Sequence, residues 1–203
     1  MWFKFNNNLE ICLRSLVRND DFRVRKWLSD PYIVEMTFVI PGPEQRKLLP
    51  FDVRTMDQYI EILLSDRHRK TYAIEASGQH IGNIGLKEID VERKKAELFI
   101  EIGEAKFRSK GIGKAAMMIL MDYFFHQMGY QEMILEVLEF NKAALRVYEQ
   151  IGFRLSHRSS WHCDAQGRYW QVWLMRLGRE RWIRQRDLIS VASNLRMQGL
   201  KAA

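Results

Sequence analysis

Alternating apolar and polar positions predict seven short strands along the chain. The first is LEICLRSL from Leu9, and TYAIEA and HIGNIGL follow it on either side of the turn signal Ser77-Gly78-Gln79. AELFIEI comes after a charged turn at residues 90–95, and MILEVL, FRLSHRSSW and RYWQVWLMRL complete the set. Period-two alternation separated by Gly, Asn, Asp and Ser is typical of antiparallel strands.

A different spacing, with apolar residues at i, i+3 and i+4, predicts helices between these strands. Asn19-Asp20-Asp21 can cap a helix over FRVRKWL that ends before Asp30-Pro31. Asp52 can cap a second helix, whose apolar face holds Met56, Ile60 and Leu63 or Leu64. A third helix begins near Gly111, and a fourth is capped by Asn141 and ended by Gly152.

The order of these elements predicts an α+β fold. It reads strand, two helices, three strands, helix, strand, helix, two strands, which favours a mixed, mostly antiparallel sheet flanked by helices with a single β-α-β passage. The length of 203 residues and a hydrophobic content of 47% fit one domain, which we place at residues 1–178. Residues 179–203 predict an extra basic, amphipathic helix with Leu188, Val191 and Leu195 on one face.

Charge and cysteine content limit the classes of partner and site. The formal charge is +7, and from Arg179 onward six cations face two acids, so the tail carries +4 of it. A secretory signal and a long apolar run are both missing from the sequence, so we expect a soluble, cytoplasmic protein without a membrane partner. Cys12 and Cys163 form no Cys-x-x-Cys pair and the five histidines lack metal-ligand spacing, so we expect neither a disulfide framework nor a metal.

The stretch RSKGIGKAAM, which begins at Arg108, is the first candidate for chemistry. It is not a P-loop, because Arg108 replaces the first glycine and Ala115 the magnesium-binding hydroxyl. It is a poor dinucleotide fingerprint, because eight residues separate it from the preceding strand. Two glycines at a helix start can let backbone N–H groups approach a pyrophosphate, although they can also simply relieve crowding.

A second stretch removes much of that ambiguity. In NKAALRVYEQIGF, Asn141 and Tyr148 are seven residues apart and so lie on one helix face. Taken together, Arg-x-x-Gly-x-Gly and Asn-x-x-Ala-x-x-x-Tyr-x-x-x-Gly-Phe resemble the GNAT family of acetyl-CoA-dependent N-acetyltransferases. GRYWQVWLMRLGRERW is similar to the closing strand of the ribosomal-protein and spermidine acetyltransferase branch.

The resemblance implies acetyl-CoA as cosubstrate and assigns residues to it. The loop would hold the pyrophosphate through Arg108, Lys110, Gly111, Ile112, Gly113 and Lys114. The pantetheine arm would lie between two strands that splay apart, at residues 97–102 and 133–138, with Ile100 and Ile102 offering backbone groups. Asn141 would orient the arm or its sulfur, and Tyr148 would be the general acid for the departing thiolate.

A base for the amine is less clearly marked. Alternation places Glu97, Phe99 and Glu101 on one strand face. Glu97 is the predicted catalytic carboxylate, Glu101 is an alternative to it, and Glu136 in the next strand is a third choice. Each of these glutamates is also compatible with a plain solvated position on a strand.

Two classes of function follow. The first is an acetyltransferase acting on a primary amine, where the basic chain favours a protein N-terminus or an amino sugar over a polyamine, and the apolar segment EMTFVIPGPEQ supplies acceptor contacts. The second is a nucleic-acid- or ribosome-binding module that uses the basic tail. The apolar stripe of that tail favours instead a helix that packs on the body or on a second subunit, as in a homodimer.

Overall fold

The computed structural model describes most of the chain. The exceptions are residues 1, 6–8, 37–59, 62, 165 and 193–203. The predicted helix cap at Asp52 and most of the segment EMTFVIPGPEQ therefore lie outside the described residues. Within the described part of the chain, no helix has the length and apolar character needed to cross a membrane.

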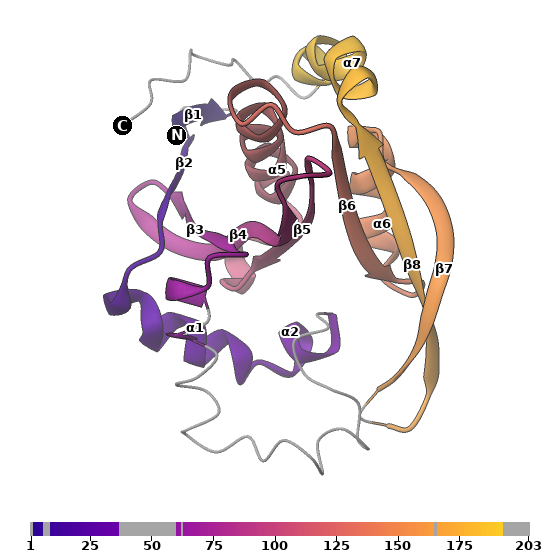
Figure 1. Cartoon of the computed structure of the whole chain (residues 1–203). Coiled ribbons are helices and arrows are strands. Elements are labelled where there is room, and N and C mark those ends of the chain that lie inside the picture. The colour runs from indigo at the N-terminus through magenta and orange to yellow at the C-terminus, as the bar shows by residue number, and fades with distance from the viewer. Residues whose placement is uncertain (1, 6–8, 37–59, 62, 165, 193–203) are drawn as a thin grey trace.

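A single sheet of eight strands forms the centre of the molecule (Figure 1). Its spatial order is β1-β2-β3-β4-β5-β6-β8-β7, and every neighbouring pair is antiparallel except β5 and β6. This is one strand more than the seven predicted, because β1 pairs with β2 at the edge. The strands are β1 (Trp2–Phe5), β2 (Leu9–Ser15), β3 (Lys70–Ala76), β4 (Gln79–Asp90), β5 (Lys95–Ile102), β6 (Glu132–Leu138), β7 (Arg154–Cys163) and β8 (Tyr169–Gly178).

The helices lie where the apolar spacing predicts them, except the one at Pro31–Met36, which follows the predicted helix end at Asp30-Pro31 and was not predicted. They are α1 (Asp21–Leu28), α2 (Pro31–Met36), α5 (Ile112–Asp122), α6 (Lys142–Ile151) and α7 (Arg179–Ala192). Helix α5 connects the two parallel strands, as the predicted β-α-β passage requires. Figure 1 shows α5 and α6 against one face of the sheet, with α1 and α2 at the lower end of the view.

Local signals in the sequence explain where several elements begin and end. Ser77 and Gly78 join β3 to β4, and both have positive φ (50° and 74°), which suits a tight hairpin. The Asn141 side chain accepts a hydrogen bond from the Ala144 amide and so caps α6, which ends at Gly152 with φ 114°. These three predictions are confirmed.

The main hydrophobic core lies between the sheet and the helices of one face. It joins ten residues of α5 and the following turn, all at most 1% exposed, to the inward side chains of the central strands. A smaller cluster holds Val24, Leu28, Ile60 and Leu63. The position of α5 is therefore set by burial on nearly all of its circumference.

The C-terminal helix α7 packs on this core. Trp182 is fully buried and its ring lies 6.4 Å from that of Phe125, while Arg186 donates to Asp122 at 3.1 Å. Leu188, expected on the apolar face, is 73% exposed. Trp182 therefore makes the contact and Leu188 does not, while the side chains of Val191 and Leu195 lie outside the described part of the chain. The domain boundary at residue 178 stays a prediction.

The burial of Trp182 generates a stability prediction. Trp182→Ala should lower the free energy of unfolding by about 3–5 kcal/mol, because it removes a large buried side chain and leaves a cavity. Leu188→Ala is the matched control on the same helix and should cost less than about 0.5 kcal/mol. Urea unfolding measures both, and equal effects would show that α7 does not depend on Trp182.

Candidate functional site

The site begins where β5 and β6 separate. Their parallel pairing runs from Lys95↔Glu132 to Glu97↔Ile134 and then stops, although β5 remains paired with β4 as far as Ile102. The predicted splay is thus present. A cavity opens beside the separated ends and is lined by Tyr32, Ile33, Met36, Ile100, Glu101, Ile102, Phe107, Arg108, Ser109, Gly111, Gly113, Lys114, Met117, Asn141, Ala143, Ala144, Val147 and Tyr148.

The glycine-rich loop forms one wall of this cavity. Gly111 is the left-handed residue (φ 78°) before α5, whose first backbone bond runs from the Ala115 amide to the Gly111 carbonyl. The N–H groups of the first turn therefore lack acceptors within the helix, and they carry its partial positive charge. A Cβ on Gly113 would lie 3.8 Å from the side chains of both Ile100 and Ile102, so the loop packs directly on β5.

Arg108 lines the cavity, and its guanidinium also binds groups of the protein itself. Its guanidinium donates to the carbonyls of Ile102 (2.9 Å) and Gly103 (2.7 Å) and to the Asp30 carboxylate (2.8 Å), and it lies over the Tyr32 ring. These bonds fasten the end of β5. Although Arg108 lines the cavity, much of its donor capacity is used within the protein.

Asn141 and Tyr148 both line the cavity, as their seven-residue spacing predicts. The oxygen of the Asn141 side chain is occupied by the Ala144 amide, so its NH₂ group is the part suited to a ligand. Burial raises the pKa of Tyr148 to about 12. The phenol therefore keeps its proton throughout the neutral range, which is the state a general acid needs.

Three predicted residues do not line the cavity. The Ile112 side chain is buried in the core and 1% exposed, so only its backbone is available to a ligand of the loop. The Lys110 ammonium lies 6.0 Å from the centre of the Phe107 ring. Glu97 belongs to the last paired position of β5 and forms an ion pair with Lys87 at 2.7 Å. Burial raises the pKa of Glu97, and Lys87 opposes that shift.

Glu101 is the glutamate that the fold brings to the cavity. Glu101 lies four residues beyond Glu97, past the paired part of β5 and β6, and its carboxylate accepts a hydrogen bond from Asn83 at 2.7 Å. Burial raises the pKa of Glu101, and the bond from Asn83 opposes that shift. Lys114 also lines the cavity, and burial lowers its pKa.

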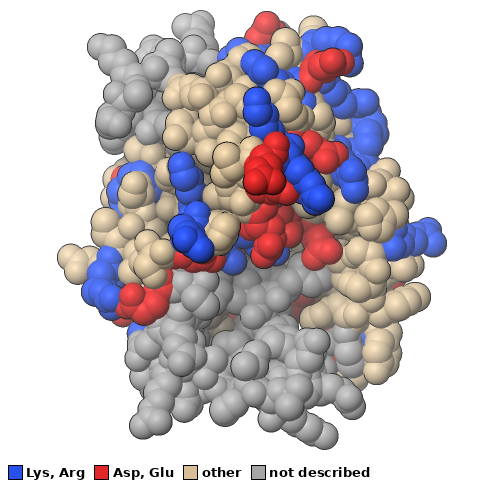
Figure 2. Space-filling model, viewed as in Figure 1, with Lys and Arg blue, Asp and Glu red and all other residues tan. Residues whose placement is uncertain are grey.

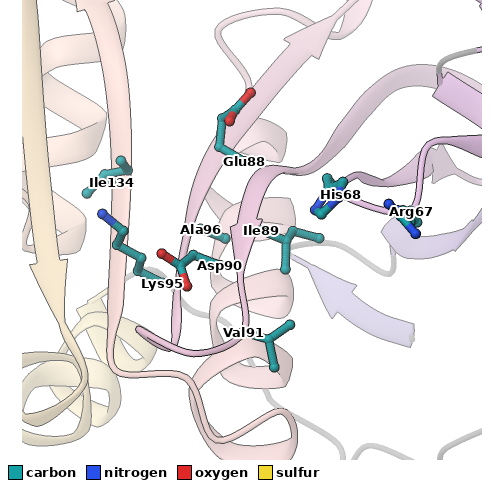
Figure 3. A pocket seen from close by; sticks show the side chains of 9 residues that line it. All are labelled: Arg67, His68, Glu88, Ile89, Asp90, Val91, Lys95, Ala96 and Ile134. Atoms are coloured by element: carbon teal, nitrogen blue, oxygen red, sulfur yellow. The ribbon is translucent and has the colours of Figure 1, made fainter.

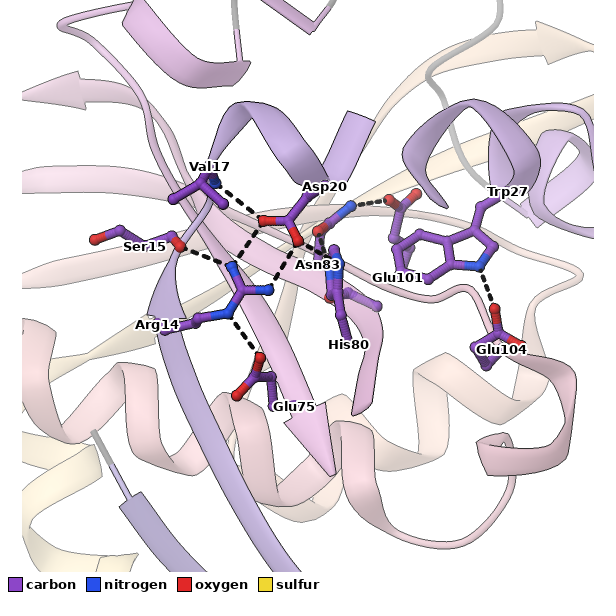
Figure 4. Close-up of polar contacts among 11 residues, drawn as sticks. Arg14, Ser15, Val17, Asp20, Trp27, Glu75, His80, Asn83, Glu101 and Glu104 are labelled. Carbon is purple, nitrogen blue, oxygen red and sulfur yellow. Dashed lines mark hydrogen bonds and ion pairs between the residues drawn. The ribbon is translucent and has the colours of Figure 1, made fainter. Parts of the chain in front are cut away.

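Sequence reasoning missed the buried residues behind Glu101. Figure 4 shows Asn83 between Glu101 and His80, with Asp20 and Arg14 beyond. Nearby, a Cβ on Gly103 would fall 2.0 Å from the Trp27 ring, so only glycine allows Trp27 to pack here. The available signal was the presence of His80 and Asn83 within the otherwise apolar run HIGNIGL.

A second hollow lies at the other end of β5 (Figure 3), beside a bulge in β4 between Lys87 and Asp90. Glu88 has φ 49° at this bulge, and Val91 is 71% exposed. The hollow contains none of the predicted site residues.

Comparison with known proteins places these features in context. Residues 10–154 match the family model described as an acetyltransferase (GNAT) domain. The uncharacterized N-acetyltransferase YokL of Bacillus subtilis is 24% identical over 104 residues, which are 51% of this chain and 58% of that protein. The spermidine N(1)-acetyltransferase of Escherichia coli K12 is 26% identical over 106 residues, which are 52% of this chain and 56% of that protein. The chain thus spans little more than half the length of these curated relatives.

Solved structures show the same fold. A spermidine N-acetyltransferase from Vibrio cholerae, in complex with CoA and spermine, superposes with a TM-score of 0.73 at 21% identity, covering 85% of this chain and 98% of that one. A domain from Methanocaldococcus jannaschii superposes with a TM-score of 0.64 at 17% identity, and the match covers 84% of this chain and 99% of that one. The predicted α+β fold is confirmed.

The contacts of Arg108 generate a second prediction. Arg108→Met should lower the free energy of unfolding by about 2 kcal/mol without any ligand, because it leaves two strand-end carbonyls and Asp30 without their donor. In Lys114→Met, the ammonium that is lost donates to Gln150 at 3.3 Å and has no other hydrogen bond among the described residues. This change should alter stability by less than about 0.5 kcal/mol. Thermal and urea unfolding of the ligand-free variants measure both. A stable Arg108→Met protein would return this arginine to a purely ligand-binding role.

Proposed function

Because the chain belongs to the GNAT family of acetyltransferases, we propose that it moves an acetyl group from acetyl-CoA to a primary amine. The observation that carries this proposal is the cavity at the separated ends of β5 and β6, which the α5 N-terminus, Asn141 and Tyr148 all reach. Its three walls supply an anion site, an unpaired strand edge and a proton donor.

The cavity has groups suited to each part of acetyl-CoA. The amides of residues 112–114 and the Lys114 ammonium suit a pyrophosphate. Beyond Glu97, β5 has lost its pairing with β6, so the backbone groups of Ile100 and Ile102 suit an extended, amide-containing arm that adds like a strand. When bound, the cosubstrate supplies a thioester carbonyl that an amine can attack.

Two residues manage protons in the proposed reaction. As the new N–C bond forms and the C–S bond breaks, Tyr148 donates its phenolic proton to the leaving sulfur. Glu101 takes the proton that the amine must lose, directly or through one water. Glu97, the residue predicted for this step, lies outside the cavity and is paired with Lys87, so we assign Glu101 to it.

The acceptor we propose is a cationic amine, with polyamines as the first class to test. The register places Glu101 and Glu97 on one face of the sheet together with Glu136 of β6, and Figure 2 shows acidic side chains gathered near the middle of the viewed surface. These carboxylates favour a positively charged acceptor more than the chain's overall charge suggests. The spermidine acetyltransferases among the relatives support the same class.

The other predictions about partners stay open. A protein N-terminus or an amino sugar remains an alternative acceptor, and a dodecameric spermidine N-acetyltransferase from Vibrio cholerae among the structural neighbours makes self-association worth measuring. A role of the basic tail in binding nucleic acid also remains a prediction. In α7, however, Arg186 is engaged with Asp122 and Trp182 is buried.

The proposed transfer is tested first by ligand binding and turnover. Acetyl-CoA at 100 times its dissociation constant should stabilise the fold by about 2.7 kcal/mol. Tyr148→Phe should keep this stabilisation and lower the turnover of a polyamine by about 100-fold or more, because it removes only the donated proton. Thermal shift and the release of free CoA thiol measure the two effects. Absence of stabilisation by acetyl-CoA would exclude the proposed reaction.

The role of Glu101 predicts a pH dependence. A base works when ionised, and burial raises the pKa of Glu101, so kcat/KM should fall as the pH drops through a value above that of an ordinary glutamate. In Glu101→Gln this acidic limb should disappear and turnover should fall by about 100-fold. Glu97→Gln, on the same strand face, is the matched control. If Glu97→Gln abolished the limb and Glu101→Gln kept it, the original assignment to Glu97 would stand.

A further inference from the structure

A row of buried polar side chains leads from Glu101 away from the cavity (Figure 4). The Nδ2 group of Asn83 donates to Oε1 of Glu101 at 2.7 Å, and Oδ1 of Asn83 lies 3.0 Å from Nε2 of His80. The other ring nitrogen of His80, Nδ1, lies 3.1 Å from Oδ1 of Asp20. His80 is 2% exposed and Asn83 1%, so bulk water does not separate these groups.

Asp20 gives this row a negative charge at its inner end. Arg14 donates to both of its carboxylate oxygens, at 2.7 and 2.8 Å, and the Val17 amide donates at 3.0 Å. Burial alone would raise the pKa of Asp20, but the bonds from Arg14 and Val17 hold it below its usual value. Asp20 is therefore ionised, and its charge favours a hydrogen on Nδ1 of His80, although the contact is an ion pair without hydrogen-bond geometry.

One arrangement of protons satisfies the contacts as they stand. The Nε2 atom of His80 faces two oxygens, Oδ1 of Asn83 and the Gly82 carbonyl at 3.0 Å, so it also carries a hydrogen. His80 is then an imidazolium ion. Asn83 donates its NH₂ to Oε1 of Glu101, so this oxygen is an acceptor, as it is in an ionised carboxylate.

A second arrangement follows from turning the Asn83 amide by 180°, which leaves the positions of its heavy atoms nearly unchanged. Its NH₂ then donates to Nε2 of a neutral His80, and its oxygen accepts a hydrogen bond from a protonated Glu101. Because Nε2 then has no hydrogen to give the Gly82 carbonyl, this arrangement also requires the ring to move away from that oxygen. Both arrangements contain one proton on the pair His80 and Glu101. An ionised Glu101 beside a neutral His80 would leave two acceptors facing each other in a buried place in either orientation of the amide, which is costly.

We propose that His80 and Glu101 are a coupled pair that holds one proton between them, with Asn83 as the positioning residue that links the two. When one group loses its proton to water, the other takes one up, so the charge of the pair is unchanged. The opposed effects of burial agree with this exchange, because burial raises the pKa of Glu101 and lowers that of His80.

Other charged and aromatic groups lie close to His80 without belonging to the row. Trp27 contacts its ring edge-on, with the centroids 4.8 Å apart, and donates to Glu104, which also binds Lys26. Glu75 lies opposite His80 on β3 and accepts from Arg14. Among the described residues, Glu101 is the one carboxyl group that reaches His80 through an amide able to turn.

The coupling deepens the proposed function and rests on it for its consequence in catalysis. A cationic acceptor in the cavity favours ionised Glu101, and through Asn83 it favours the imidazolium form of His80. By linkage, a protonated His80 then favours acceptor binding to the same extent. The acceptor would thus prepare the base that removes its proton.

The experiment is an NMR pH titration of ¹⁵N-histidine in the full chain without ligands. The chain has five histidines, and the signal missing from His80→Gln identifies His80. In Glu101→Gln the pKa of His80 should fall by about one unit, because the imidazolium ion loses a nearby negative charge. Glu97→Gln removes a carboxylate of the same strand face outside the row and should leave the titration unchanged.

Two results would overturn the coupling. One is a His80 titration curve in Glu101→Gln that is the same as in the wild-type protein, including the case in which the ring titrates in neither. The other is a fall in the His80 pKa in Glu97→Gln that equals the fall in Glu101→Gln. Because the titration uses neither acetyl-CoA nor an amine, an inactive wild-type protein that still shows the shift would refute the proposed reaction and support the coupling.

The link through Asn83 has its own test. In Asn83→Leu, which has nearly the same size and cannot turn an amide, Glu101→Gln should no longer move the His80 titration by more than about 0.3 units. A shift as large as in the protein with Asn83 would show that the two groups interact through space alone, and the positioning role of Asn83 would be wrong.

Discussion

The separation of β5 from β6 is the constraint on which the rest of the structure depends. Parallel pairing ends at Glu97 and Ile134, while β5 continues beside β4 to Ile102. One edge of β5 is thereby left with backbone donors and acceptors that need partners. The cavity, the glycine loop and the two residues Asn141 and Tyr148 are all arranged around this edge.

An open strand end inside a protein has to be held in place, and polar contacts do so here. Arg108 binds the carbonyls of Ile102 and Gly103, and Gly103 gives the room in which Trp27 packs. Asn83 holds the side chain of Glu101 from the neighbouring strand. The groups that stabilise the end of β5 are therefore the same ones that shape the site, so stability and function share residues in this region.

Local charge and overall charge differ in this molecule. The chain is basic, with a formal charge of +7, yet the sheet face beside the site carries Glu97, Glu101 and Glu136. Several of the cations are used inside the fold: Arg14 binds Asp20 and Glu75, and Arg186 binds Asp122. Net charge and the register of two strands therefore point to different acceptors, and the cationic amine that we propose follows the register.

The sequence by itself determined the order of the elements, the positions of most turns and caps, and the family. These features depend on neighbours within a few residues: alternation in β3 to β5, the Asn141 cap, and the spacing of Gly111, Gly113, Asn141 and Tyr148. What only the tertiary structure decided depends on contacts between distant segments. Glu97 and Glu101 are equivalent in sequence pattern, and they differ because strand pairing ends between them. Arg108 binds the end of β5 and Asp30, which is 78 positions away along the chain. The row of buried polar side chains connects Asp20 to Glu101, which are 81 positions apart. No short-range pattern records such contacts, because they form only when the sheet brings its strands together.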